Sequence, residues 1–246
     1  MKENFFSTCR ETPSGPNFHL ALETTPDPSF PNLISVKIPY SGSQNGFPTT
    51  GERKKIDHIE DSLTSIIESP QTRFVGRILK PNLSIIYFYS KSSGHPEVTI
   101  KTGLFKKESF SLETQPDPEW HFYAANIKPT PLELHMNRSA QLHIVLLENG
   151  DDPSKPRVVD IGCTFPTRTA LENFLAAATA AGFGHSDPKD WGSPEDPVDP
   201  AEDYWCELTK TTSIEPETIA QVCVDVEALC ESHGGEFDGW ACPVMK

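Results

Sequence analysis

Six cysteines have the most distinctive chemistry in this chain, because thiols bind metals and take part in redox reactions. Zinc sites usually contain closely spaced pairs such as C-x-x-C, and the sequence has no such pair. Five of the six fall on expected strands or an expected helix of the C-terminal part: Cys163, Cys206, Cys242, Cys223 and Cys230. One hypothesis is a metal site that includes His185 or His233. Alternation with apolar neighbours favours burial as small apolar side chains, so we expect no metal and no cofactor.

A group formed by Asp117, Glu119 and His121 could support general acid–base chemistry. It suggests a second hypothesis, an unrecognised hydrolase with a site between two domains. The sequence lacks the glycine-rich phosphate-binding motifs and the G-x-S-x-G and H-E-x-x-H motifs. Many active sites have no local motif, so their absence argues only weakly against an enzyme. We expect no catalytic residues.

Acidic residues and prolines dominate the segment from Asp187 to Asp203. Lys189, Trp191 and Val198 break the ligand spacing of a calcium loop. The segment is therefore either a solvated loop or a docking site for a basic protein segment. Exposed charge pairs contribute only ~0.2–1 kcal/mol each, so aromatic residues must supply most of the affinity. The candidate partner-binding residues are Trp191, Glu195, Asp196, Asp199, Trp205, Glu207, Asp238 and Trp240.

The triplet Asp238-Gly239-Trp240 has two interpretations. Gly239 could supply a β-bulge or a positive φ, with Trp240 in the core, which is a structural role. Alternatively, the triplet could contact a partner. The structural role is the more common one for such a triplet, and both interpretations stay open at this point.

Negative charge is concentrated in the C-terminal part of the chain. Residues 1–150 hold 15 Lys+Arg and 16 Asp+Glu, whereas residues 151–246 hold 6 and 19, a net charge of -13. Phosphate backbones are repelled by such a field, while a basic protein segment is attracted to it. The alternative is that this charge serves solubility alone. We expect a protein partner and no direct binding of nucleic acid.

The sequence predicts a cytoplasmic protein without a membrane anchor. It has no run of about 18 apolar residues, which is the length that spans a bilayer. Residues 1–15 lack the apolar stretch of a secretory signal. Thiols stay reduced in the cytoplasm, so we expect no disulfide framework.

Residues 1–150 are expected to form an α+β domain. Strands are predicted at 5–10, 18–24 and 33–40, and at 73–79 and 83–90 as a hairpin. Residues 85–89 are apolar throughout, which predicts a strand covered on both faces. Apolar residues at helical spacing predict a helix over 50–68. A second helix is predicted over 131–148, with Pro131 near its first turn and Asn149-Gly150 at its end, and a short helix is expected near 94–104. On the second helix, His135 and His143 lie two turns apart, too far to share a metal, and structural or exposed roles are expected. Residues 151–156 are the expected linker.

Residues 157–246 predict an ordered series of elements with the pattern βαββαβ. Strands are expected at 157–165, 183–186, 204–211 and 237–244, and helices at 167–181 and 215–233. This order is typical of the ferredoxin-like sandwich, in which two helices cover one face of a four-stranded antiparallel sheet. The other face is left open, and alternation assigns to it Val158, Asp160, Trp205 and Glu207. The overall fold class is therefore α+β with two domains.

The C-terminal domain resembles a known family of regulators. The matching features are the opening at 157–160, the helix that ends at 181–183, the acidic segment, and the ending at 235–240 with its Phe-Asp-Gly-Trp sequence. These features occur in the same order in the family called regulator of ribonuclease E activity B, which the chain resembles over about residues 157–245. The resemblance implies inhibition of an RNA-degrading enzyme by direct protein binding.

The N-terminal domain resembles the bacterial domain family of unknown function number 695. The segments that carry the resemblance are residues 32–36, 60–61, 74–77 and 117–123. That family is often fused ahead of the regulator domain, so the two resemblances support each other. It supplies no activity of its own, and the extra domain distinguishes this chain from a stand-alone regulator.

We therefore expect a non-catalytic regulatory protein that binds a protein partner, such as a basic segment of a ribonuclease. The ferredoxin-like fold also occurs in RNA-binding RRM domains, but their aromatic strand motif is absent here and the domain is acidic. The alternatives are the hydrolase described above and an immunity-type module that neutralises one cognate toxin. Nothing in the sequence fixes an oligomeric state.

Overall fold

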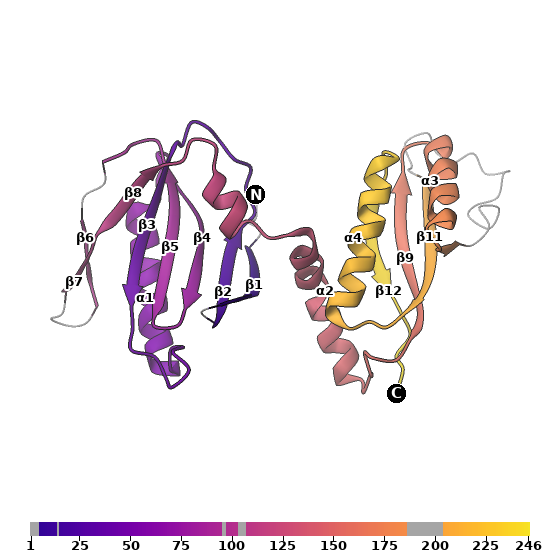
Figure 1. Cartoon of the computed structure of the whole chain (residues 1–246), viewed down its shortest axis with the longest axis horizontal. Coiled ribbons are helices and arrows are strands. Elements are labelled where there is room, and N and C mark those ends of the chain that lie inside the picture. The colour runs from indigo at the N-terminus through magenta and orange to yellow at the C-terminus, as the bar shows by residue number, and fades with distance from the viewer. Residues whose placement is uncertain (1–4, 14, 95–96, 103–106, 186–203) are drawn as a thin grey trace. The chain divides into compact units, whose positions relative to one another are not determined.

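The structure is a computed structural model that describes residues 5–13, 15–94, 97–102, 107–185 and 204–246. It contains two compact units, Met1–Pro129 and Thr130–Lys246, called the N-terminal and C-terminal units below (Figure 1). The sequence placed the domains at 1–150 and 157–246, so the division in the structure lies earlier. The reason is helix α2 (Pro131–Glu148), which packs along helix α4 (Pro216–Ser232) of the C-terminal unit.

The N-terminal unit is built on a six-stranded antiparallel sheet. Its order is β1-β2-β4-β5-β3-β8, with bounds Phe5–Thr12, Gly15–Leu22, Thr72–Lys80, Leu83–Ser90, Asn32–Pro39 and Leu112–Pro116. The predicted hairpin of β4 and β5 is present, and Asn82 in its turn has a φ of 62°. The prediction of a helix near 94–104 is wrong, because Val98–Lys101 forms strand β6, which pairs with β7 (Lys107–Phe110). The β-branched residues of Val98–Ile100 explain this preference.

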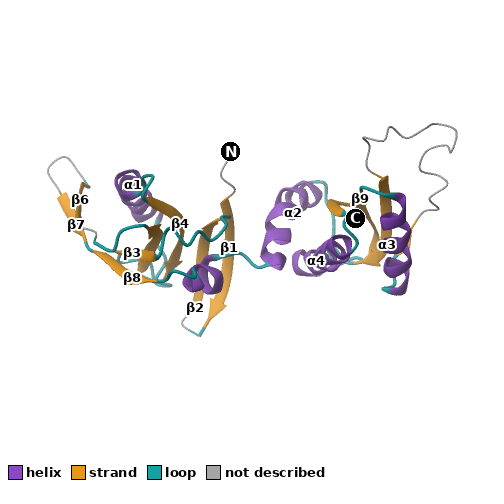
Figure 2. Ribbon diagram, turned by 90° about the horizontal axis from the view of Figure 1, so that it is seen from above, coloured by secondary structure: helices purple, strands orange, loops and turns teal. Residues whose placement is uncertain are grey.

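Both faces of this sheet are covered. Helix α1 (Thr50–Ile67) packs its apolar stripe on one face, and a capping box between Thr49 and Glu52 fixes its start. Trp120 and the π-helical turn η1 (Tyr123–Ile127) belong to a second core cluster, separate from that of α1. In Figure 2 the short helical turn after β8 lies on the side of the sheet opposite α1. The central strand β5 is buried between the two layers. This arrangement explains why its sequence is apolar almost throughout, as predicted.

The C-terminal unit has the predicted ferredoxin-like fold. Its antiparallel sheet has the order β10-β11-β9-β12, with bounds Gly184–His185, Tyr204–Thr212, Arg157–Phe165 and Glu236–Ala241. Helices α3 (Arg168–Ala180) and α4 cover one face, where their apolar stripes meet Val159, Ile161, Cys163 and Phe165 (Figure 1). The alternation in β9 therefore places every second residue in the core. A β-bulge interrupts the pairing of β12 with β9 between Phe237 and Gly239.

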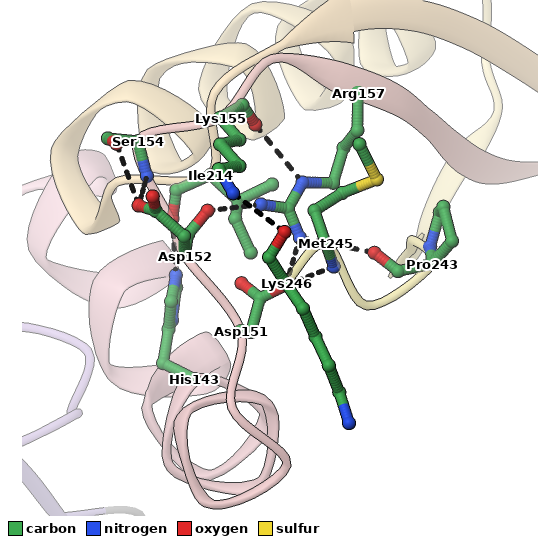
Figure 3. A network of polar contacts seen from close by, with 10 residues as sticks. All are labelled: His143, Asp151, Asp152, Ser154, Lys155, Arg157, Ile214, Pro243, Met245 and Lys246. Carbon is green, nitrogen blue, oxygen red and sulfur yellow. Dashed lines mark hydrogen bonds and ion pairs between the residues drawn. The ribbon is translucent and has the colours of Figure 1, made fainter.

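A buried ion pair ties the start of β9 to the segment that follows β12. Arg157 Nη1 lies 2.5 Å from Asp151 Oδ1, and both side chains are almost fully buried (Figure 3). Asp151 Oδ1 also accepts a hydrogen bond from the Met245 amide, and Arg157 donates to the carbonyls of Asp152 and Pro243. These contacts hold residues 151–157 and 243–246 together as one polar cluster of the C-terminal unit.

Among the described residues, none of the helices has both the length and the apolar character that crossing a membrane requires.

Candidate functional site

The uncovered face of the C-terminal sheet, called the open face, carries acidic and apolar side chains. Strand register places on it residues 158, 160, 162 and 164 of β9, residues 205, 207, 209 and 211 of β11, and residues 236, 239 and 241 of β12. Val158 is 48% exposed and Trp205 is 43% exposed, which is unusual for side chains of this size. None of these strand residues is Lys or Arg, whereas Asp160, Glu207 and Glu236 are acidic. Exposed tryptophan is enriched at protein-binding surfaces, and the carboxylates around it give this surface a negative charge.

Three of the sequence-predicted residues come together around Gly162 at the middle of this face. A Cβ atom at Gly162 would lie 3.4 Å from both Asp238 Cβ and Trp205 Nε1. Glu207 lies directly opposite Gly162 in the ladder between β9 and β11. Asp238 reaches the same place because it is the extra residue of the β-bulge in β12. Trp205, Glu207 and Asp238 therefore form one cluster, although Asp238 is about 30 residues from the other two in sequence.

Trp240 lies on the other side of the sheet and supports the fold. It pairs with Ile161, whose side chain points into the core. Its Nε1 donates a 2.8 Å hydrogen bond to Ser139 Oγ on α2, and its ring lies 5.7 Å from that of His143. The structure thus connects Trp240 to α2 and not to the cluster around Gly162.

A groove adjoins the open face along β12. It has a volume of about 590 Å³ and is lined by residues of α2, of the C-terminal half of α4 and of β12. Buried His135 forms its inner wall, with Nε2 3.0 Å from Glu227 Oε2, and Arg138 Nη1 lies 3.2 Å from Glu227 Oε1. The Glu227 carboxylate thereby joins α4 to two residues of α2.

The groove is acidic at its rim. Glu231, Glu236 and Asp238 line it, and none of them forms an ion pair with another described residue. Arg138 is the one Lys or Arg among the lining residues, and its charge is already balanced by Glu227. Sequence reasoning missed this groove, because α2 had been assigned to the N-terminal domain. Pro131 and Asn149-Gly150 predict the two ends of α2 but not the surface that it packs against.

The four remaining predicted partner-binding residues, Trp191, Glu195, Asp196 and Asp199, lie outside the described residues.

The cysteines of the C-terminal unit are part of its core. Cys163 and Cys206 lie directly opposite each other on β9 and β11, and Cys230 of α4 is buried with them. Hydrogen bonds with Cys206 and Cys230, together with burial, raise the pKa of the Cys163 thiol far above its ordinary value. Burial raises the pKa of Cys223 to about 12, with a further contribution from Glu227. Within the described part of the chain, no group of three His, Cys, Asp or Glu residues is arranged to hold a metal ion.

The residues of the hydrolase hypothesis stabilise a local turn. The buried carboxylate of Asp117 accepts hydrogen bonds from the amides of His121 and Phe122, each 2.9 Å long, and from the Tyr89 hydroxyl at 2.5 Å. Burial raises the pKa of Asp117, but these hydrogen bonds lower it more, so the pKa lies below its ordinary value. The His121 side chain is 83% exposed and its Nδ1 is 3.9 Å from Asp117 Oδ1. This arrangement gives Asp117 a capping role.

Two family models match the chain, one for each unit. The model described as "Family of unknown function (DUF695)" matches residues 3–126. The model described as "Regulator of ribonuclease activity B", RraB, matches residues 139–242, from the middle of α2 to the end of β12. No curated protein matches the chain. The second match includes α2 residues that line the groove, in agreement with the division of the chain in the structure.

Proposed function

Because the chain belongs to the DUF695 family of unknown function and its C-terminal unit is an RraB-type domain, we propose that it is a non-catalytic regulator. It binds a protein partner and thereby inhibits an RNA-degrading endonuclease. The RraB match supports a regulatory, protein-binding role in general. The identity of the target as an endonuclease of the ribonuclease E type is the specific part of the proposal.

The open face is the observation that carries this proposal. It presents the exposed Trp205 beside the carboxylates of Glu207 and Asp238, and no described element covers it. Tryptophan is enriched among the residues that dominate binding energy, and surrounding polar residues exclude water from such contacts. A sheet face of this kind accommodates a second protein surface better than a small metabolite, which requires a deep concave site.

Charge indicates the chemistry of the partner. Residues 151–246 have a net charge of -13, and the strand residues of the open face include no Lys or Arg. A basic segment of the endonuclease is attracted to such a surface, while RNA itself is repelled. On sequence grounds alone, the proposal also includes Trp191, Glu195, Asp196 and Asp199 as contacts. RNA degradation of this type takes place in the bacterial cytoplasm, where the proposal locates the protein.

Isothermal titration of the full chain into a purified ribonuclease E-type endonuclease tests the proposal. We expect saturable binding, and we expect Trp205→Ala to weaken it by about 2 kcal/mol or more, which is roughly a thirtyfold increase in Kd. Ile66→Ala is the matched control, because Ile66 is an exposed apolar residue of the N-terminal unit. Absence of binding, or equal binding by wild type and Trp205→Ala, contradicts the proposal.

A further inference from the structure

We propose that the groove between α2, α4 and β12 receives arginine side chains of a basic segment of the partner, an inference that rests on the proposed function. The groove adjoins the open face, because Glu236 and Asp238 belong to both. A segment bound across the open face can therefore continue over β12 into the groove.

The charge of the groove selects a cation. Three carboxylates at its rim, those of Glu231, Glu236 and Asp238, have no ion-pair partner among the described residues. Arg138, the single basic residue of the lining apart from His135, is paired with Glu227 at 3.2 Å. A bound cation would meet carboxylates on two walls, α4 and β12.

The aromatic residues of the groove favour arginine over lysine. Phe237 and Trp240 line it, and both rings are held in place: Phe237 by an edge contact with His135 at 5.2 Å, Trp240 by its hydrogen bond to Ser139. The planar guanidinium group stacks on aromatic faces and donates hydrogen bonds to carboxylates in a fork. The ammonium group of lysine is a compact, strongly hydrated charge and gains less from such a surface.

The edge of β12 is open but poorly suited to regular strand pairing. Strand β12 is the last strand in the sheet order of the described residues, and a Cβ atom at Gly239 would meet no other atom within 4 Å, so there is also space over the face of the strand. The β-bulge at Asp238 disrupts the ladder, a feature that prevents edge strands from adding another strand. We therefore infer that side chains, and not a continuous backbone ladder, hold the occupant in the groove.

The inner wall is fixed before anything binds. Glu227 is held by His135 at 3.0 Å and by Arg138 at 3.2 Å, so α2 and α4 are joined across the base of the groove. A site whose walls are held by their own contacts loses less conformational entropy on binding.

Fluorescence anisotropy with a short fluorescein-labelled oligoarginine peptide and the full chain tests this inference. The groove variant is Glu231→Gln/Asp238→Asn. The control Glu217→Gln/Asp225→Asn removes the same charge from exposed positions of α4 outside the groove. We expect the groove variant to bind about tenfold more weakly, equivalent to about 1.4 kcal/mol, and the control to bind like wild type. An oligolysine peptide of equal length should bind wild type more weakly than oligoarginine.

Equal losses in the two variants, or equal affinity for arginine and lysine peptides, overturn the inference, because either result indicates attraction by net charge alone. Unchanged thermal unfolding midpoints exclude misfolding as the cause of a loss. The endonuclease titration separates this inference from the proposed function. If the endonuclease binds wild type and groove variant equally, the inference fails while the proposed function stands. If oligoarginine binds in the groove and the endonuclease does not bind, the proposed function fails.

Discussion

At the scale of single residues, the Arg157–Asp151 pair is an ion pair with both side chains buried in the C-terminal unit. Both groups are buried, and the Arg157 guanidinium also donates to three backbone carbonyls, those of Asp152, Lys155 and Pro243. Removing one member of a buried pair leaves the other charge without compensation. The pair holds residues 151–157 against residues 243–246. Its net contribution to the free energy of unfolding is small compared with that of apolar residues of similar size.

We predict that Arg157→Met lowers the free energy of unfolding by about 3–5 kcal/mol, because Asp151 is left as an isolated buried charge. The double variant Arg157→Met/Asp151→Leu should recover much of this loss. Urea unfolding followed by circular dichroism measures both values. A loss below about 1 kcal/mol for Arg157→Met would show that the pair is dispensable.

Acid should destabilise the protein through Asp151 and Asp117. Burial raises the pKa of each carboxyl, but hydrogen bonds lower it more, above all from Arg157 in one case and Tyr89 in the other. A carboxyl with a lowered pKa in the folded state contributes stability above its unfolded pKa of about 3.9 and loses it as the pH falls further. The thermal unfolding midpoint, measured at several pH values between about pH 6 and pH 2, should decrease as the pH falls below about 4. The double variant Asp117→Asn/Asp151→Asn should show a flatter profile, and an identical slope would contradict this assignment.

Thiol reactivity should divide the cysteines into two groups. Cys9 is exposed, whereas four cysteines are buried: Cys163, Cys206, Cys223 and Cys230. Thiolates and not thiols are the reactive species, and burial raises the pKa of Cys223 to about 12. A colorimetric thiol reagent at neutral pH should modify Cys9 in the native protein and the four buried thiols only after unfolding. Rapid native modification of Cys163 would contradict its place in the core.

The residue scale also shows where sequence reasoning succeeded. Strand alternation assigned Trp205 and Glu207 to the open face, because side chains alternate between the two faces of a sheet. Asp238 shares that face for a different reason, since the extra residue of a bulge does not follow the alternation. Trp240 was predicted from the sequence to contact a protein partner, but its Nε1 donates a hydrogen bond to Ser139 of α2. Ser139 is too distant in sequence for this contact to be anticipated.

At the scale of elements, helix α2 separates what a pattern can predict from what it cannot. Pro131 near its first turn and Asn149-Gly150 at its end predicted its bounds correctly. Its place in the C-terminal unit depends on contacts with α4 and β12, such as His135 with Glu227, which no local pattern reveals. The groove was missed for the same reason. The strand at 98–101 was missed because its four residues are too few for a clear period.

We predict that a fragment of residues 130–246 folds cooperatively, whereas a fragment of residues 157–246 is clearly less stable. The shorter fragment lacks α2, which covers Phe237 and Trp240, and lacks the Asp151 partner of Arg157. Thermal unfolding followed by circular dichroism compares the two. Equal midpoints would indicate that α2 is not an integral part of the C-terminal unit.

At the scale of the whole molecule, the two units differ both in how their sheets are covered and in their net charge. The N-terminal unit buries both faces of its sheet, while the C-terminal unit leaves one face uncovered within the described part of the chain. Most of the negative charge lies in the unit with the open face. These features favour the C-terminal unit as the part that binds the proposed basic protein partner.

The rate of RNA cleavage by a purified ribonuclease E-type endonuclease, at increasing concentrations of the full chain, tests the central claim most directly. We predict that wild type lowers the rate to a plateau, and that Trp205→Ala requires at least about tenfold more protein for the same effect. A cleavage rate that stays constant at every concentration of wild type, or identical inhibition by wild type and Trp205→Ala, would contradict the account.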